Sequence, residues 1–150
     1  MAIARGAGTE IIRSVHYKIT DNNTSDMDLI VGVQHHIYTV LSIICYADNA
    51  CDNLTVWVDG YDAIGGTSGA NIKLFKTKAL SEGQTYVFND KFSFNGTEPT
   101  DFTSEPLSTA AEQDLIADQA TTTSQYLRCA KGHNNDQWHL NITYIDQNNA

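Results

Sequence analysis

Hydrophobic and polar residues alternate with a period of two along much of the chain. Between Ile11 and Ile19 the odd positions are Ile, Arg, Val, Tyr and Ile, whereas the even positions are Ile, Ser, His and Lys. Successive side chains of a β-strand point to opposite faces, so this alternation predicts strands between two environments. The almost continuously apolar stretch from His36 to Ala47 predicts a central strand of a sandwich. About nine strands are expected, at 11–19, 28–33, 36–47, 53–61, 70–77, 84–89, 91–95, 124–130 and 137–146.

Clusters of Gly, Asn and Asp separate these segments, as in ADNACDN, DAIGGTSGAN, LSEGQ and KGHNND. Such residues tolerate positive φ or form local side-chain turns. One short helix is also expected, because Thr109-Ala-Ala-Glu112 has the form of a capping box and TAAEQDLIADQ continues it up to the threonines at 121–123. This helix would lie across one end of the sandwich, before the last two strands.

The pattern predicts an all-β fold, an antiparallel β-sandwich of jelly-roll type with one short helix. Short strands at regular spacing, only two prolines and no alternation of strands with helices favour this architecture. No linker, repeat or low-complexity tract divides the chain, so residues 1–150 are expected to form a single domain. The small, polar residues 1–9 are expected to form a short N-terminal arm.

The charge composition disfavours binding to nucleic acid. Nine Lys or Arg residues against eighteen Asp or Glu residues give a net charge of −9, and the basic residues are scattered singly. No apolar run is long enough to span a membrane. The N-terminal MAIARGAGTE lacks the apolar core of a secretory signal, so synthesis in a cytoplasm is expected. Three cysteines without C-x-x-C spacing, at 45, 51 and 129, predict free thiols.

The pair His35-His36 raises the question of a metal site. Adjacent strand residues point to opposite faces, so both imidazoles cannot bind one ion unless a bulge intervenes. His133 and His139 have no acidic residue at a useful spacing to complete a ligand set. We therefore expect no metal and no cofactor, and we interpret the pair as strand-start histidines that bond to backbone. Calcium in the loop DNNTSDMD is an alternative, but the spacing is not that of an EF-hand and a solvated turn is favoured.

No arrangement of residues indicates catalysis. Cys45 falls in the buried run, and Cys51 follows Asp48 and precedes Asp52, which disfavours a thiolate. The chain lacks G-x-S-x-G, G-x-x-x-x-G-K and H-E-x-x-H. Asp59 and Asp62 are loop acids without a predicted cleft, and they do not define a glycosidase pair. The sequence thus predicts no catalytic residues and a protein that is not an enzyme.

The aromatic residues suggest binding surfaces. Trp57 falls on the polar phase of its strand, opposite to Leu54, Val56 and Val58, and Tyr61 follows just beyond Gly60. An aromatic residue out of phase is either covered by the helix or loops, or presented to a partner. A second group, Tyr86, Phe88, Phe92 and Phe94, surrounds Asn89-Asp90 and is interpreted as the core of a hairpin.

The chain as a whole resembles small virion structural proteins of tailed bacteriophages, particularly those of aquatic bacteria. The resemblance lies in MAIARGAGTEIIRS, QHHIYTVLSI, the stretch NDKFSFNGTEPTDFTS and the terminal IDQNNA, and it spans most of the 150 residues. It implies a structural component of the virion, made in the host cytoplasm. Two roles are open: a capsid decoration (cement) protein, or a tail- or fibre-associated protein.

Each role implies partners. A decoration protein would bind the major capsid protein or other virion proteins and stabilise the assembled head shell, as a homo-oligomer, trimer or dimer, around a symmetry axis. A tail or fibre protein could be a glycan-binding jelly roll, with a sugar ring stacked on Trp57 or Tyr61. Neither role involves direct binding to nucleic acid or a membrane.

The segment ARGAGTEIIRS is the candidate for partner binding at the N-terminus. Its small residues can approach another backbone closely, and the alternation that follows is that of a strand. Such an arm could extend a neighbouring sheet, with Ile3, Arg5, Ile11 and Ile12 in contact with the partner. The alternative is an ordinary first strand with a frayed tip.

Overall fold

The structure is a computed structural model, and it describes residues 10–99, 108, 109, 111 and 120–148. Nearly all of these residues lie in or between β-strands. The strands are β1 (Glu10–Ile19), β2 (Met27–Val31), β3 (His36–Ala47), β4 (Leu54–Asp62), β5 (Thr67–Lys76), β6 (Thr85–Phe88), β7 (Phe92–Asn95), β8 (Thr97–Pro99), β9 (Ala120–Ser124), β10 (Tyr126–Lys131) and β11 (Trp138–Asn148).

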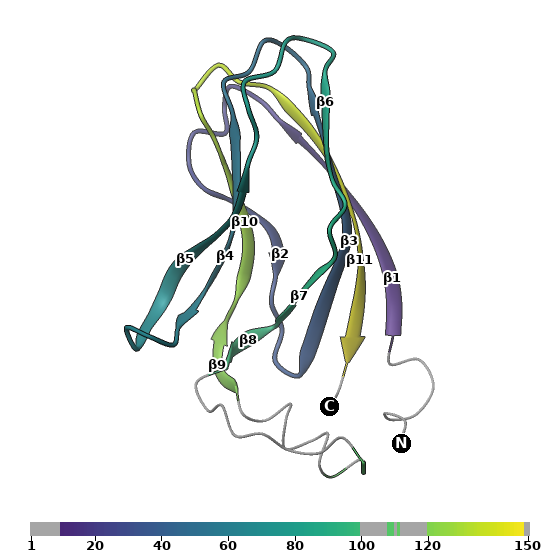
Figure 1. Ribbon diagram of the computed structural model, residues 1–150, viewed down its shortest axis with the longest axis vertical. Helices are drawn as coiled ribbons and strands as arrows, with labels where there is room; N and C mark the ends of the chain where they lie inside the picture. The colour runs from purple at the N-terminus through teal and green to yellow at the C-terminus, as the bar shows by residue number, and fades with distance from the viewer. Residues whose placement is uncertain (1–9, 100–107, 110, 112–119, 149–150) are drawn as a thin grey trace.

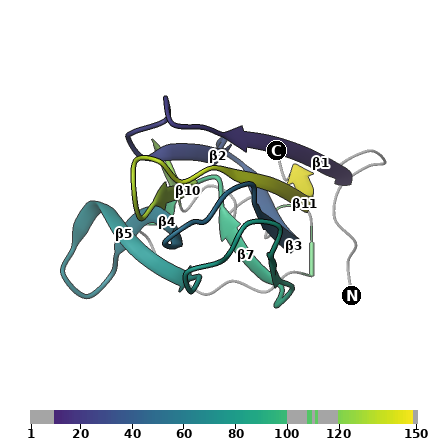
Figure 2. The same cartoon turned by 90° about the horizontal axis from the view of Figure 1, so that it is seen from above.

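Two sheets face each other (Figure 1 and Figure 2). The first sheet has the order β1-β11-β3, and both β6 and β7 pair with the far side of β3. The second sheet has the order β2-β10-β4-β5. All pairings are antiparallel. Because β1 to β4 alternate between the sheets and the last strand, β11, lies beside β1 and β3, the connections are those of a jelly roll, which confirms the predicted fold class.

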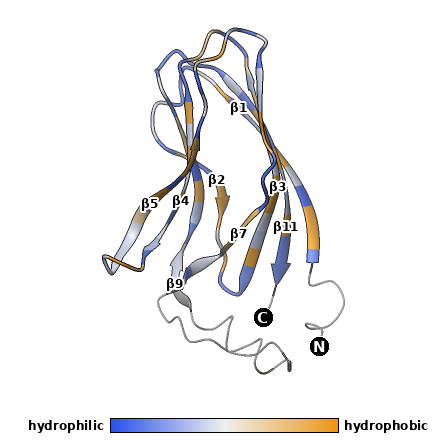
Figure 3. Ribbon diagram, in the orientation of Figure 1, coloured by the Kyte–Doolittle hydropathy of each residue, from blue (hydrophilic) through white to orange (hydrophobic). Residues whose placement is uncertain are grey.

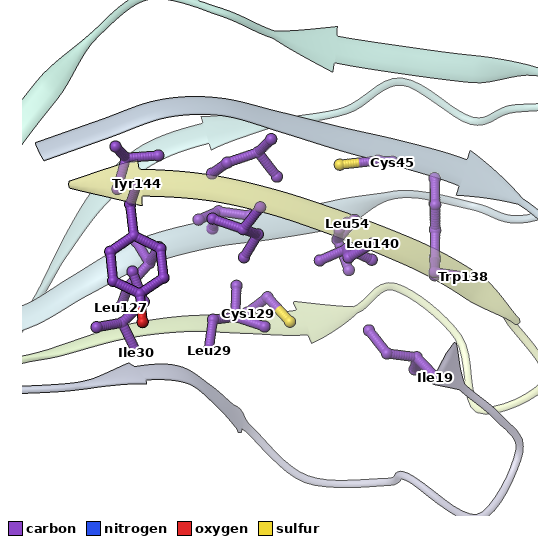
Figure 4. Close-up of a cluster of buried hydrophobic side chains, with 14 of the residues drawn as sticks. Ile19, Leu29, Ile30, Cys45, Leu54, Leu127, Cys129, Trp138, Leu140 and Tyr144 are labelled. Atoms are coloured by element: carbon purple, nitrogen blue, oxygen red, sulfur yellow. The ribbon is translucent and has the colours of Figure 1, made fainter. Parts of the chain in front are cut away.

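The core fills the space between the two sheets. Every second residue of β11 points inward, and these side chains meet the inward residues of β3, β4 and β10, as Figure 4 shows. Figure 3 shows the same alternation of hydrophobic and hydrophilic residues along the strands. The fully buried residues include Trp138, Leu140, Ile142, Val40, Ile43, Cys45, Leu54, Val56, Leu127 and Cys129.

The predicted hairpin at residues 84–95 is wrong. β6 and β7 do not pair with each other: β6 pairs with residues 43–46 of β3, and β7 pairs with residues 37–40 of the same strand. The aromatic side chains pack across the sandwich instead. Phe88 stacks on Phe75 of the second sheet with ring centroids 4.4 Å apart, and Phe92 meets the edge of Phe88 at 5.9 Å. Residues 89–91 therefore interrupt one edge strand and do not form a hairpin turn.

Two strands were not anticipated. β8 and β9 form a separate two-stranded ribbon in which Thr97 lies opposite Ser124 and Pro99 opposite Ala120. The threonines at 121–123, expected to end a helix, belong to β9, so three strands, and not two, follow the predicted helix. Residues 110 and 112–119 of that helix, and the N-terminal arm 1–9, lie outside the described residues.

Three chain segments cross in close contact where the two sheets meet the β8–β9 ribbon. Gly32 follows β2, Gly96 lies between β7 and β8, and Gln125 lies between β9 and β10. The amide of Gly32 donates to the carbonyl of Gln125 at 2.8 Å, and the amide of Gln125 donates to the carbonyl of Gly96 at 2.9 Å. A Cβ on Gly96 would lie 1.8 Å from the carbonyl oxygen of Val33, and one on Gly32 would lie 2.0 Å from the carbonyl oxygen of Gly96. Only glycine permits this approach of backbone to backbone.

Candidate interaction surfaces

Trp57 lies on the outer face of the second sheet, as its position out of phase with Val56 and Val58 predicts. The side chain is nevertheless only 2% exposed. Lys73, which pairs with Trp57 across β4 and β5, places its Nζ 4.6 Å from the centroid of the indole ring. A lysine of the neighbouring strand therefore lies over the ring. Partner binding by Trp57 remains a prediction, and it would have to involve the edge of the ring or a movement of Lys73.

A cavity of about 520 Å³ adjoins Trp57. The indole Nε1 of Trp57 is buried and has no hydrogen-bond partner among the described residues. Around the cavity stand an amide, a hydroxyl, two ammonium groups and one carboxylate, which could bind a small polar ligand. The lining residues are Asp26, Thr55, Trp57, Asn71, Lys73, Leu74, Phe75, Lys76 and Ala130.

The acidic residues near Trp57 have structural contacts. Arg128 lies beside Trp57 in the sheet register, donates to Asp28 Oδ1 at 2.6 Å, and also pairs with Asp59. Asp62 accepts hydrogen bonds from the amides of Ile64 and Gly65 in the β4–β5 turn, at 2.9 and 3.0 Å. Asp59 and Asp62, expected in loops, both lie in β4, where Asp59 pairs with a guanidinium and Asp62 accepts from turn amides. Tyr61 is half-buried on β4 and does not line the cavity.

The two adjacent histidines have different roles. His35 precedes β3 in a turn with φ of 68°. His36 is the first residue of β3, and its Nδ1 donates to Oδ1 of Asp146 at 2.6 Å, while Arg13 Nε donates to Oδ2 of the same carboxylate at 3.0 Å. The expectation that both histidines bond to backbone is therefore wrong for His36. Among the described residues no group of three or more His, Cys, Asp or Glu side chains could hold a metal ion.

The three cysteines are free and buried. Burial raises the pKa of Cys45 and of Cys129 from 9.0 to about 12. Burial also raises the pKa of Cys51, and Asp136 and Asp48 act in the same direction, although hydrogen bonds to Gln137 and Asn49 partly oppose them. All three therefore remain neutral thiols in the folded protein at neutral pH.

Four strands of the first sheet, β11, β3, β6 and β7, have no charged residue on their outward side. The outward positions of β11, β3, β6 and β7 carry Thr, Ser, Asn, Ile, Val, His, Gln and Tyr, with no Asp, Glu, Lys or Arg. Hydroxyl groups bridge the strands, as between Thr39 and Ser93 at 2.9 Å. Val87 is 51% exposed and Ile44 is 37% exposed. We call this surface the neutral face and define it by Thr39, Ile44, Val87, Ser93, Asn141 and Thr143.

The remaining candidate residues belong to the N-terminal segment. Ile11 and Ile12 lie in β1 and are 48% and 72% exposed. Ile3 and Arg5 lie outside the described residues. Among the described residues no helix is long and apolar enough to cross a membrane.

No protein-family model matches the chain, and no curated protein matches it. The fold is similar to that of a protein from Bacillus endospore appendages, described as disulfide-linked pili, with 11% identity, a TM-score of 0.45, and coverage of 99% of this chain and 96% of that one. It is also similar to a protein of the T13 IBDV viral particle (10% identity, TM-score 0.42) and to one of infectious bursal disease virus Gx strain (7% identity, TM-score 0.39). This chain covers 38% and 32% of those two viral chains.

Proposed function

We propose that this protein is a structural component of a bacteriophage virion, a capsid decoration protein that binds the assembled head shell and stabilises it. The sequence resemblance to virion proteins of tailed bacteriophages supports this proposal. In it, the protein resides in the virion, contacts the major capsid protein, acts by binding alone and turns over no substrate.

The neutral face is the observation that carries the proposal. The chain has a net charge of −9, yet the central strands of one sheet present a broad outer surface without a charged side chain. Charged residues are depleted in the centre of protein–protein interfaces, because their removal from water is costly. A surface of small hydroxyl and amide groups with half-exposed aliphatic residues can be removed from water by a partner with a small free-energy penalty.

Binding of this kind stabilises a shell by mass action. A protein that binds the assembled shell but not the dissociated subunits adds RT ln(1 + [L]/Kd) per site, which is about 2.7 kcal/mol at a hundredfold excess over Kd. Contact with two neighbouring subunits at once would resist the outward pressure of a packaged genome.

The shells are expected to rupture at a higher temperature when the protein is bound than when it is absent. Val87→Glu places a charge in the neutral face and should lower the affinity for shells at least tenfold, because an unpaired carboxylate would be buried in the contact. Light scattering during heating measures rupture, and cosedimentation with shells measures binding.

Ile72→Glu is the matched control. Ile72 is 46% exposed on β5, in the second sheet, so the same charge is introduced away from the neutral face. This variant should bind like the unmodified protein. Equal rupture temperatures with and without the protein would contradict the stabilising role, and equal binding by both variants would contradict the assignment to the neutral face.

A second candidate function is carbohydrate binding by a tail- or fibre-associated protein, which the cavity beside Trp57 favours. A saccharide could accept a hydrogen bond from the indole N–H and contact Asn71 and Thr55. Lys73 and Lys76 would favour a sugar that carries a carboxylate.

Glycan-array screening at millimolar ligand tests the second candidate. We expect acidic saccharides to bind and Trp57→Phe, which keeps an aromatic ring but removes the N–H, to weaken binding about tenfold. Ile72→Ala, on the same strand as Lys73 but outside the cavity lining, should bind normally. An array without any bound glycan, or one on which Trp57→Phe behaves like the unmodified protein, would count against a saccharide site here.

A further inference from the structure

β1 is an edge strand, and its outer side has no partner strand among the described residues. It pairs through all ten positions with β11 on its inner side, without a register shift. Figure 1 shows it at the margin of the first sheet. An edge strand presents a row of backbone donors and acceptors to which another strand can be added.

The other sheet edges are less suited to strand addition. The edge formed by β6 and β7 is interrupted at residues 89–91. β5 has two register shifts against β4, a glycine with positive φ at Gly69, and the exposed Lys73 and Lys76. β2 has only five residues and one register shift against β10. Interruptions, bulges and lysines are devices that discourage edge pairing, and β1 has the longest regular edge of the four.

The sequence of β1 is complementary to itself in one antiparallel register. A twofold axis perpendicular to the sheet does not exchange the two faces of the sheet. Directly opposite residues of an antiparallel pair point to the same face, so the axis must pass midway between the two copies of one residue, which we describe as lying on the axis. With Ser14 on the axis, Glu10 of each copy lies opposite Lys18 of the other, which gives two opposite-charge pairs per dimer. Glu10, Ser14 and Lys18 are all exposed and share the outer face.

The same register covers apolar surface. Ile12, which is 72% exposed, lies opposite His16 of the other copy on the outer face. Ile11, which is 48% exposed, lies opposite Tyr17 of the other copy on the inner face. Figure 3 shows the hydrophobic residues at the Glu10 end of β1. Covering these two side chains favours association, because the hydrophobic effect scales with the apolar area removed from water.

The neighbouring registers lack this complementarity. With Arg13 on the axis Glu10 would face His16 and Ile12 would face Ser14, and with Val15 on the axis Lys18 would face Ile12 and Glu10 would face Thr20. The register centred on Ser14 is the one that brings Glu10 and Lys18 together, and it uses the strand from residue 10 to residue 18.

From these observations we infer that two copies of this chain associate through antiparallel β1–β1 pairing centred on Ser14, which joins their first sheets into one continuous sheet. This inference goes beyond the proposed function and does not depend on it, because the pairing forms in solution without a shell.

Disulfide trapping tests the register directly. With Ser14 on the axis, its two Cα atoms are about 4.5–5.5 Å apart, within the range that a disulfide spans. Ser14→Cys treated with copper phenanthroline as oxidant is expected to give mostly covalent dimer at micromolar protein. His16→Cys, on the same face, is the matched control: the two residues 16 lie about 14 Å apart along the paired strands, and little dimer should form. The native cysteines are buried and do not interfere.

Charge reversal supplies a second readout. Glu10→Lys and Lys18→Glu should each weaken the dimer about tenfold in sedimentation equilibrium, because each places like charges opposite each other twice. The double variant Glu10→Lys/Lys18→Glu should restore the original affinity. Both positions are exposed, so the thermal midpoints of the monomers serve as a check that folding is unchanged.

Three results would overturn the inference: a monomer at all concentrations up to about 100 μM, equal cross-linking of Ser14→Cys and His16→Cys, or a double charge reversal that is weaker than either single variant. Loss of shell binding with an intact dimer would instead bear on the proposed function alone.

Discussion

Gly96→Ala is expected to lower the free energy of unfolding by at least about 3 kcal/mol, a large fraction of the stability of a domain of this size. The new Cβ would lie 1.8 Å from the carbonyl oxygen of Val33 and within 3 Å of two further backbone atoms of that residue. No flexible side chain can move aside, because the contact is with backbone. The fold must open at the crossing of Gly32, Gly96 and Gln125, and the hydrogen bonds of that crossing are then lost.

Urea unfolding followed by tryptophan fluorescence measures this effect, since the fully buried Trp138 reports on the core. Gly83→Ala is the control. Gly83 has φ of 83°, but a Cβ there would meet nothing within 4 Å. This control should cost only about 1 kcal/mol, which is the penalty of the left-handed backbone for alanine. Similar losses in the two variants would show that the chains at the crossing are not in tight contact.

Alkaline pH is the second condition with a large expected effect, and stability should fall steeply as pH rises from about 9 to about 12. Burial raises the pKa of the thiols of Cys45 and Cys129 to about 12, and burial also raises the pKa of Tyr38 to about 12. In the unfolded chain the thiols lose their protons near pH 9, and in the folded protein they keep them. Each deprotonation therefore favours the unfolded state. The stability that comes from burying the neutral thiols is fully present below pH 9 and is lost as the pH rises to about 12.

The size of the alkaline effect follows from the shift. A difference of about three pKa units corresponds to an upper limit on the order of 4 kcal/mol for each buried thiol. Urea midpoints at pH 8, 9 and 10.5 measure the slope. Cys45→Ala should give a shallower slope, whatever its effect on stability at pH 8, because it removes one titrating group. A midpoint that stays constant up to pH 10.5 would contradict the burial of these thiols.

The alternation of residues predicted the layers of the fold better than the partners of each strand. Periodicity predicted a strand at 137–146, close to the observed β11, and placed Trp57 out of phase with the core, because both depend only on the geometry of a single strand. It assigned Phe88 and Phe92 to a hairpin, since a turn-like pair, Asn89-Asp90, separates two apolar runs. Both runs pair with β3, and no local signal distinguishes these two outcomes.

The short ribbon β8–β9 was missed for a related reason. Thr97–Pro99 has no alternation and contains a proline, and its partner strand begins at Ala120, so the pairing is set by distant parts of the chain. The glycines of the crossing also look like ordinary turn residues in the sequence. Their need for close backbone approach becomes visible only when the three segments are placed together.

The contacts of His36 and Trp57 could likewise not be predicted from the sequence. The contact of His36 with Asp146 joins residues 110 positions apart, so sequence spacing could not suggest it. The cover over Trp57 depends on the register between β4 and β5, which a bulge next to Trp57 shifts. The absence of charged residues from the outward positions of β3 and β11 is a signal that the sequence alone could supply, because outward positions follow from the alternation.

The ribbon of β8 and β9 fixes two positions of the chain to which a foreign peptide could be joined. Pro99 and Ala120 lie opposite each other in the ribbon, and the hydrogen bonds of the crossing at Gly96 and Gln125 hold the ribbon against the two sheets. A foreign peptide joined to these two residues would have both of its ends held close together by the ribbon. The jelly roll would then serve as a carrier for a displayed epitope or enzyme.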